Sequence, residues 1–165
     1  MTGAEQAVER FIEGHEKLTQ VFGYWPTFHD AEIIDMHLWR GDVDCAAKRY
    51  VFPVLTVKLH VWELTNEVDP RGYLVRRHHT LTKLRFHDVL DFRMDGFNQQ
   101  NAIFGLSIVR EQRTEWPSPA FAVSFEPVFG MGATFISSRV EVVDAVACSD
   151  KGAPLEEGKL PNLSG

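Results

Sequence analysis

The stretch LTVKLHVW, residues 55–62, alternates an aliphatic side chain with a polar or aromatic one at every position. Successive side chains of a β-strand point to opposite faces, so this period of two predicts a strand with one face in a core. The same alternation recurs in residues 34–39, 84–94, 104–108, 121–125 and 136–142. Sequences typical of turns separate these segments, at residues 40–42, 69–72, 95–96, 116–119 and 130–132. The pattern predicts several half-buried antiparallel strands.

The segment that precedes the first strand has a different period. Apolar residues recur at helical spacing over residues 4–22, Thr2 and Glu5 have the spacing of a capping box, and Gly23 stands at the C-cap position. We therefore predict an α+β fold, in which an N-terminal helix packs on one face of a mostly antiparallel sheet of six or seven strands. A half-open barrel is a variant of this arrangement.

Length and composition set further bounds. The chain has 165 residues, a formal net charge of −6 and two cysteines, Cys45 and Cys148, far apart in the sequence. We expect one domain over residues 1–148 and a flexible tail over 149–165, which lacks periodicity. The acidic balance weighs against a nucleic-acid partner, and no apolar run is long enough to span a membrane. No secretory signal is evident, and the cysteines are typical of free thiols, so we expect a cytoplasmic protein.

Strand parity predicts the composition of the second sheet face. The side chains that point away from the predicted core are Asp35, His37 and Trp39, then Lys58, His60 and Trp62, then Lys83, Arg85 and His87. A face that combines Trp, His and Arg is typical of a protein-binding surface. The candidate partner-binding residues are His37, Trp39, His60, Trp62, Arg85 and His87. The alternative is that a loop or the C-terminal tail covers the tryptophans and the histidines are ordinary solvated strand residues.

Two His-Asp pairs are the candidates for a metal site: His29-Asp30 and His87-Asp88. Imidazole and carboxylate groups coordinate metals together, but adjacent residues of a strand point to opposite faces and cannot reach one ion. Motifs for nucleophilic catalysis or phosphate binding are also missing from the sequence. We therefore predict no metal, no cofactor and no catalysis. Asp88 has core parity, so we expect either a bulge that turns it outward or hydrogen bonds from a neighbouring loop, with a catalytic acid as the remaining alternative.

Three stretches resemble one known family. GYWPTFHDAEI, residues 23–33, resembles the opening motif of the immunity protein 50 family, which is found beside bacterial polymorphic toxins. LRFHDV (84–89) with GFNQQN (96–101) resembles its central strand pair and turn, and residues 121–142 are similar to its closing hairpin. The resemblance covers about residues 20–146, and we expect the N-terminal helix and the polar tail to lie outside it and residues 65–80 to be an insertion. It implies a protein that binds and neutralises a cognate toxin, and it transfers no catalytic residue.

Within the first motif, six residues are predicted to serve the fold: Trp25, Pro26, Phe28, His29, Asp30 and Glu32. Trp25 and Phe28 flank the corner between helix and first strand, where they would fill the edge of the core. Asp30 is expected to accept backbone N–H groups at the start of the next strand.

The sequence leaves two other functions open. One is a small-molecule-binding or hydrolytic domain whose pocket is lined by His37, His60, Arg85 and His87. The other is a structural domain that forms a homodimer through its second sheet face. Binding to a cognate protein toxin is the leading hypothesis.

Overall fold

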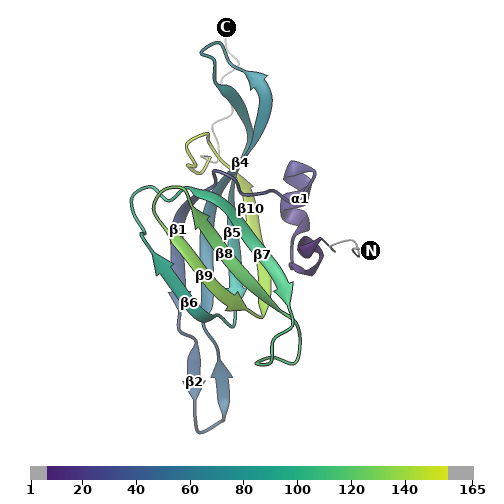
Figure 1. The fold of residues 1–165 in the computed structure, drawn as a ribbon, viewed down its shortest axis with the longest axis vertical. Helices are drawn as coiled ribbons and strands as arrows, with labels where there is room; N and C mark the ends of the chain where they lie inside the picture. The colour runs from purple at the N-terminus through teal and green to yellow at the C-terminus, as the bar shows by residue number, and fades with distance from the viewer. Residues whose placement is uncertain (1–6, 156–165) are drawn as a thin grey trace.

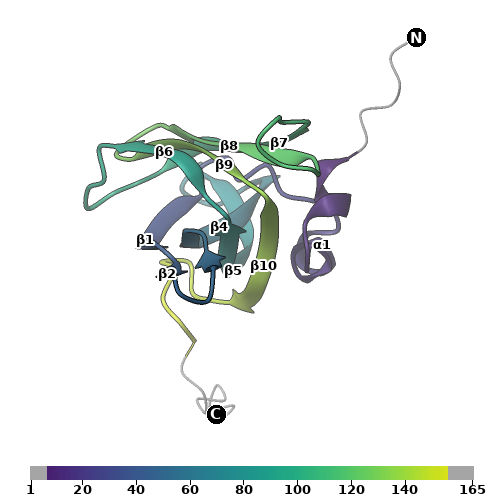
Figure 2. The same ribbon diagram turned by 90° about the horizontal axis from the view of Figure 1, so that it is seen from below.

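The computed structural model describes residues 7–155, which form two four-stranded antiparallel sheets packed face to face (Figures 1 and 2). In spatial order the first sheet contains β1 (Glu32–Trp39), β4 (Val54–Val68), β5 (Leu74–His87) and β10 (Arg139–Ala147). The second contains β6 (Leu90–Asp95), β9 (Gly132–Ser137), β8 (Ala120–Pro127) and β7 (Ile103–Glu111). A separate hairpin pairs β2 (Asp42–Asp44) with β3 (Arg49–Val51). The helical elements are η1 (Val8–Phe11), a 3-10 turn, and α1 (Glu16–Phe22).

The core lies between the two sheets. The aliphatic positions of residues 55–62, namely Leu55, Val57, Leu59 and Val61, are all buried there, which confirms the alternation predicted for β4. From β5, the ring of Phe86 packs edge to face against Phe135 of β9, with centroids 5.0 Å apart, and against Phe125 of β8 at 6.1 Å. Interdigitated rings of this kind contribute about 0.5–1.5 kcal/mol each beyond the area that they bury.

The helix does not cover a sheet face, so this part of the prediction is wrong. The second sheet covers that face, and the N-terminal segment closes the side of the sandwich between β10 and β7 (Figure 2). The Glu13 N–H donates to Val140 O at 3.0 Å, and the Val142 N–H donates to Glu13 O at 2.7 Å. This bridge to β10 interrupts the predicted helix, and Gly14, at φ +69°, supplies the break. The capping pair Thr2 and Glu5 lies outside the described residues.

The strand count is also higher than predicted: the described residues contain ten strands in three antiparallel sheets, and the two large sheets do not close into a barrel. Residues 84–94 explain part of the difference. They were expected to share one parity, but Asp88, at φ +54°, ends β5 and the chain crosses to the second sheet. Asp88 is not turned outward by a bulge within a strand; its carboxylate accepts a hydrogen bond from Ser138 Oγ in the β9–β10 turn. The second of the two expectations for Asp88 is the one observed.

A bulge does occur in β1, at a residue that parity assigned to the core. The register with β4 shifts between Ile33 and Asp35, so that Ile34 is the extra residue. Ile33 is buried in the core, whereas the side chain of Ile34 is 41% exposed. The bulge restores the predicted parity for the rest of the strand: Met36 lies opposite the core residue Val57.

The corner between α1 and β1 is built around Phe28, whose side chain is 2% exposed and whose φ is +60°. The Trp25 ring packs against it with centroids 5.5 Å apart. Asp30 also has a positive φ, of +64°, and its N–H donates to Ile103 O at 2.9 Å. Its carboxylate lies 3.1 Å from His29 Nδ1, so its partner among the described contacts is an imidazole and not the backbone N–H groups that we expected.

Residues 149–155 form a compact turn at the end of β10. The Gly152 N–H donates to Ser149 O, the Ser149 N–H donates to Ala153 O, and Cys148 bridges to Pro154. The boundary at residue 148 remains a prediction, and residues 156–165 of the predicted tail lie outside the described part of the chain. Among residues 7–155, no helix has the length and apolar character needed to cross a membrane.

Candidate functional site

The side of the first sheet that faces away from the second sheet is called the outer face here. Its residues come from β1, β4, β5 and β10 in rows fixed by the strand register. One row runs from His37 through Thr56 and Arg85 to Glu141, each residue directly opposite the next. The Arg85 Nε–H donates to Thr56 Oγ1 at 3.5 Å. Strand alternation thus brings three of the predicted strands together on one face.

The next row carries an unusual distribution of charge. Lys58 of β4 lies directly opposite Lys83 of β5. Asp35 lies opposite Lys58 on one side, and Asp144 lies opposite Lys83 on the other, with 4.0 Å between the Lys83 and Asp144 charged groups. Like charges in directly opposed positions destabilise a sheet. The outer face therefore has a basic centre between two acidic edges.

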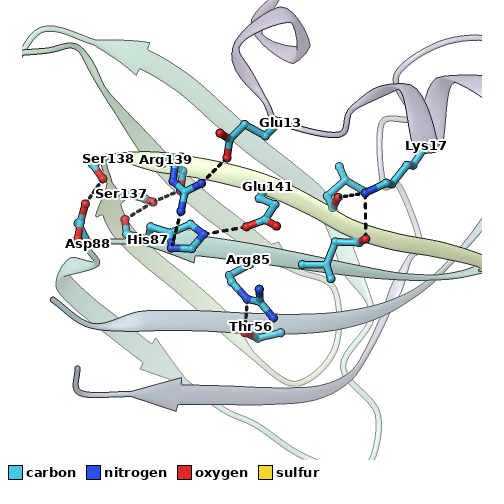
Figure 3. A network of polar contacts seen from close by, with 12 residues as sticks. Glu13, Lys17, Thr56, Arg85, His87, Asp88, Ser137, Ser138, Arg139 and Glu141 are labelled. Atoms are coloured by element: carbon cyan, nitrogen blue, oxygen red, sulfur yellow. Dashed lines mark hydrogen bonds and ion pairs between the residues drawn. The ribbon is translucent and has the colours of Figure 1, made fainter. Parts of the chain in front are cut away.

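A network of polar contacts occupies the outer face where β5 ends and β10 begins (Figure 3). His87 Nε2 lies 2.9 Å from Glu141 Oε2, and the Arg139 guanidinium donates to His87 Nδ1 at 3.3 Å. A second guanidinium nitrogen of Arg139 donates to Glu13 Oε2 at 2.6 Å, which ties the N-terminal segment to the same network. Because a guanidinium can only donate, His87 Nδ1 accepts and Nε2 carries the proton toward Glu141.

These contacts fix charges in place and do not activate a nucleophile. The hydrogen bond from His87 holds the pKa of Glu141 below its usual range, and Arg85 contributes to the same shift. The nearby hydroxyl groups are already engaged: Ser137 Oγ donates to the His87 and Arg139 carbonyls, and Ser138 Oγ donates to Asp88. The network stabilises the junction between two strands and engages the Arg139 guanidinium with Glu13 and His87.

The other end of the outer face is covered. The His60 side chain is 4% exposed, and a Cβ placed on Gly152 would lie 2.8 Å from His60 Nδ1, so the turn of residues 149–155 rests on this ring. His60 Nε2 lies 3.0 Å from His79 Nδ1, and the Trp62 ring packs against His60 with centroids 4.8 Å apart. Burial lowers the pKa of His60 from 6.5 to about 4, with smaller contributions from His79 and Arg76.

The six candidate partner-binding residues share the outer face but differ in exposure. His37 and Trp39 are exposed, with Trp39 at 44%, and Arg85 and His87 are half-buried. His60 is buried and Trp62 is half-buried beneath the Arg76 guanidinium, 4.7 Å from the ring centroid. The alternative of covered tryptophans and solvated histidines does not describe these two, because the turn after β10 covers the buried His60 and Arg76 of β5 lies over Trp62. The motif residues lie elsewhere, in the α1–β1 corner: Trp25, Pro26, Phe28, His29, Asp30 and Glu32.

Several residues of this face were not among the sequence-based candidates. His79 and Arg76 contact His60 and Trp62, and Glu141 and Arg139 contact His87. His79 and Glu141 follow the alternation of their own strands, so parity could have placed them on the face. Their partners could not be found that way, because they depend on which strands are neighbours.

The structure offers no formed metal site in the part of the chain that it describes: no group of three or more His, Cys, Asp or Glu side chains is placed to hold an ion. His87 and Asp88 contact different partners, because β5 ends at His87 and Asp88 follows it at positive φ. For His29 and Asp30 the parity argument is wrong, because they form a turn and lie 3.1 Å apart.

The enzyme hypothesis expected a pocket lined by His37, His60, Arg85 and His87. A cavity of about 570 Å³ lies away from the outer face, between η1 and β7, and Val8, Phe11 and Arg110 line it. On the outer face, His37 of β1 is exposed, whereas His60 of β4 is buried under a turn. These side chains therefore do not converge on one cavity.

Comparisons of this sequence and structure with known proteins identify its family. The model of the family described as immunity protein 50 matches residues 14–146. This range begins before α1, so α1 lies inside the family match, contrary to our expectation, whereas positions 4–13 of the predicted helix precede the match. A search of curated proteins and a search of solved structures each gave no significant match. Because the match spans most of the chain, the protein belongs to the immunity protein 50 family.

Proposed function

We propose that this protein is a cytoplasmic immunity protein that neutralises a cognate toxin of a polymorphic toxin system by binding it directly, without catalysis. Family membership supports the class of function. The observation that carries the proposal is the outer face, where the exposed Trp39 and His37 share a surface with the half-buried cations of the central strands. Exposed aromatic and arginine side chains are the groups that dominate binding energy at protein interfaces.

The charge pattern supports a protein partner. The opposed pair Lys58 and Lys83 costs folding energy, and Asp35 and Asp144 flank it only from the edges. A carboxylate of a partner placed over the centre of the face would relieve this repulsion. The acidic edges would favour basic groups around it, so the face is suited to a partner surface of matching, alternating charge.

The test is binding to the protein encoded immediately upstream of this chain's gene, carrying a substitution that abolishes its toxicity. We expect Trp39→Ala and Arg85→Ala each to weaken binding by about 30-fold, which corresponds to about 2 kcal/mol at an interface hot spot. Phe104→Ala is the matched control, since Phe104 is also exposed but belongs to β7 of the second sheet. Its affinity should stay within about 2-fold of the wild type, as expected for a residue outside the interface.

Two results would contradict the proposal. If the wild-type chain does not bind the upstream protein in titration calorimetry, the function is wrong. If it binds and Phe104→Ala weakens the complex as much as Trp39→Ala does, the outer face is not the binding surface. Unfolding midpoints should accompany each affinity, so that loss of fold is not mistaken for loss of contact.

A further inference from the structure

The β2–β3 hairpin has no role in the core that would explain its composition. It forms a sheet of its own, with Asp42 opposite Val51, Val43 opposite Tyr50 and Asp44 opposite Arg49. It extends beyond both large sheets at the lower end of the molecule in Figure 1. The buried core cluster contains no residue between positions 38 and 54. A two-stranded hairpin in water is marginally stable by itself, so its sequence needs another reason.

The exposed side chains of this region are unusually apolar. Six large apolar residues in and beside the hairpin are each between 44% and 55% exposed: Leu38, Trp39, Val43, Tyr50, Val51 and Phe52. Single exposed apolar residues are ordinary, but a concentration of them on one protruding element indicates an interaction site. Trp39 joins this group to the outer face, so the hairpin continues the surface proposed above for the toxin.

The root of the hairpin is tightly constrained. Gly41 is buried at φ +85°, and a Cβ there would lie 1.8 Å from Val51 O, a distance that no side chain can occupy. Asp42 accepts a hydrogen bond from the Val43 N–H, and Asp44 accepts one from the Ala47 N–H. These contacts constrain the root and the turn of the hairpin, and such pre-organisation lowers the entropic cost of binding.

The charges of the hairpin point to the chemistry of its partner. Asp44 lies 3.6 Å from Arg49, so these two charges offset each other. Arg40 and Lys48 are exposed and have no ion-pair partner among residues 7–155. Asp42 offsets one of these two charges, so residues 40–52 carry a net charge of +1 (Arg40, Lys48 and Arg49 against Asp42 and Asp44), although the chain as a whole carries −6. A complementary surface is apolar and bordered by carboxylates.

The long β4–β5 hairpin at the opposite end also exposes apolar residues, but its contacts are internal. The Arg71 guanidinium lies over the Tyr73 ring at 5.8 Å, and Arg77 pairs with Glu67 at 2.5 Å. Asp69 accepts hydrogen bonds from the Arg71 and Tyr73 N–H groups and organises the turn. Its polar groups thus have partners of their own, which makes it a suitable control.

We propose that the β2–β3 hairpin, residues 40–52, is the element that this protein inserts into its cognate toxin, against an apolar cleft bordered by carboxylates. This inference rests on the proposed function and adds the element that makes the contact and the chemistry of the surface that receives it. Val43 and Tyr50 are the central pair, because they are directly opposed and share one side of the hairpin.

The test compares two double variants of the full chain against the same probe, the inactivated protein encoded upstream. Val43→Ser with Tyr50→Ser should weaken binding by at least about 30-fold, because both apolar anchors are lost. Leu64→Ser with Tyr73→Ser removes equally exposed apolar groups from the β4–β5 hairpin and should leave the affinity within about 3-fold of the wild type. Neither variant should change the unfolding midpoint appreciably, because all four side chains are exposed.

The outcomes separate the two proposals. A wild-type chain that does not bind the probe overturns the proposed function and this inference with it. Binding that is strong in the wild type and unchanged in the Val43 and Tyr50 variant overturns the inference alone, as does equal loss in the Leu64 and Tyr73 variant. If the wild type sediments as a dimer and the Val43 and Tyr50 variant as a monomer, a second copy of the chain occupies the hairpin and the inference is wrong.

Discussion

Acid should destabilise this protein through His60, well above the pH at which its carboxylates titrate. The ring lies under the turn of residues 149–155, faces His79 at 3.0 Å, and has its pKa lowered from 6.5 to about 4. Arg76 adds to the shift and Asp150 opposes it. In the unfolded chain the imidazole takes up a proton near its ordinary pKa. The unfolded state therefore binds more protons than the folded state between about pH 6.5 and about pH 4, and stability falls as the pH falls through that window.

The size of the effect follows from the shift. A difference of roughly 2.5 pKa units corresponds to about 3 kcal/mol once the pH is below 4, at about 1.36 kcal/mol per unit. At pH 5 about 2 kcal/mol of this is lost relative to pH 7.5, as an upper bound. For a domain of this size, the midpoint temperature of thermal unfolding should be about 4–8 °C lower at pH 5 than at pH 7.5. The pKa of Glu141 is lowered, so that carboxylate contributes only in more acidic solution.

The assay is thermal unfolding followed by circular dichroism across this pH range. His60→Phe keeps a ring under the turn but removes the titrating group, so its midpoint should change with pH less than half as much as that of the wild type. His37→Phe is the matched control, because His37 is exposed on the same face, and its pH dependence should equal that of the wild type. A wild-type midpoint that is the same at pH 7.5 and pH 5, or an unaltered slope in His60→Phe, would refute the reasoning.

Three further predictions concern stability and can be read from thermal or denaturant unfolding. Phe28→Ala should cost about 3–5 kcal/mol, because the ring is buried and alanine keeps the same left-handed backbone constraint; a midpoint within about 2 °C of the wild type contradicts this. Trp62→Ala should cost about 2–3 kcal/mol, whereas Trp39→Ala should cost less than about 1 kcal/mol, and equal losses would mean that both rings are structural. Gly14→Ala should cost about 2–3 kcal/mol, since its Cβ would lie 2.5 Å from the Val142 carbonyl oxygen. Gly23→Ala, also at positive φ but in open space, should cost only about 1 kcal/mol, and the same loss at both positions would exclude a role for the close contact.

The candidate site could be predicted in part because parity is a local property. His37, Arg85 and the residues opposite them lie on the outer face as the alternation requires. Exposure could not be predicted in the same way, since it depends on what packs on a face. His60 has the same parity as Lys58, yet only His60 is covered by the turn after β10, about 90 residues further along the chain.

The predictions from sequence failed where a regular strand or helix is interrupted. At Ile34 and Asp88 an unbroken alternation concealed a bulge and a crossing between sheets, which positive φ or register shows but residue type does not. Gly14 lies within the stretch of helical spacing, and it is where the predicted helix is replaced by a bridge to β10.

By itself the sequence determined that much of the chain forms half-buried antiparallel strands, the buried parity of β4, the Gly23 helix end and the family, because each depends on residues within a few positions of one another. Only the tertiary structure decided that a second sheet, and not the helix, covers the core face. It also decided that the N-terminal segment closes the side of the sandwich between β10 and β7, and that the β2–β3 hairpin is left without a core partner. The physical reason is that an apolar strand face must be buried, but the alternation of its residues does not indicate which distant surface packs against it.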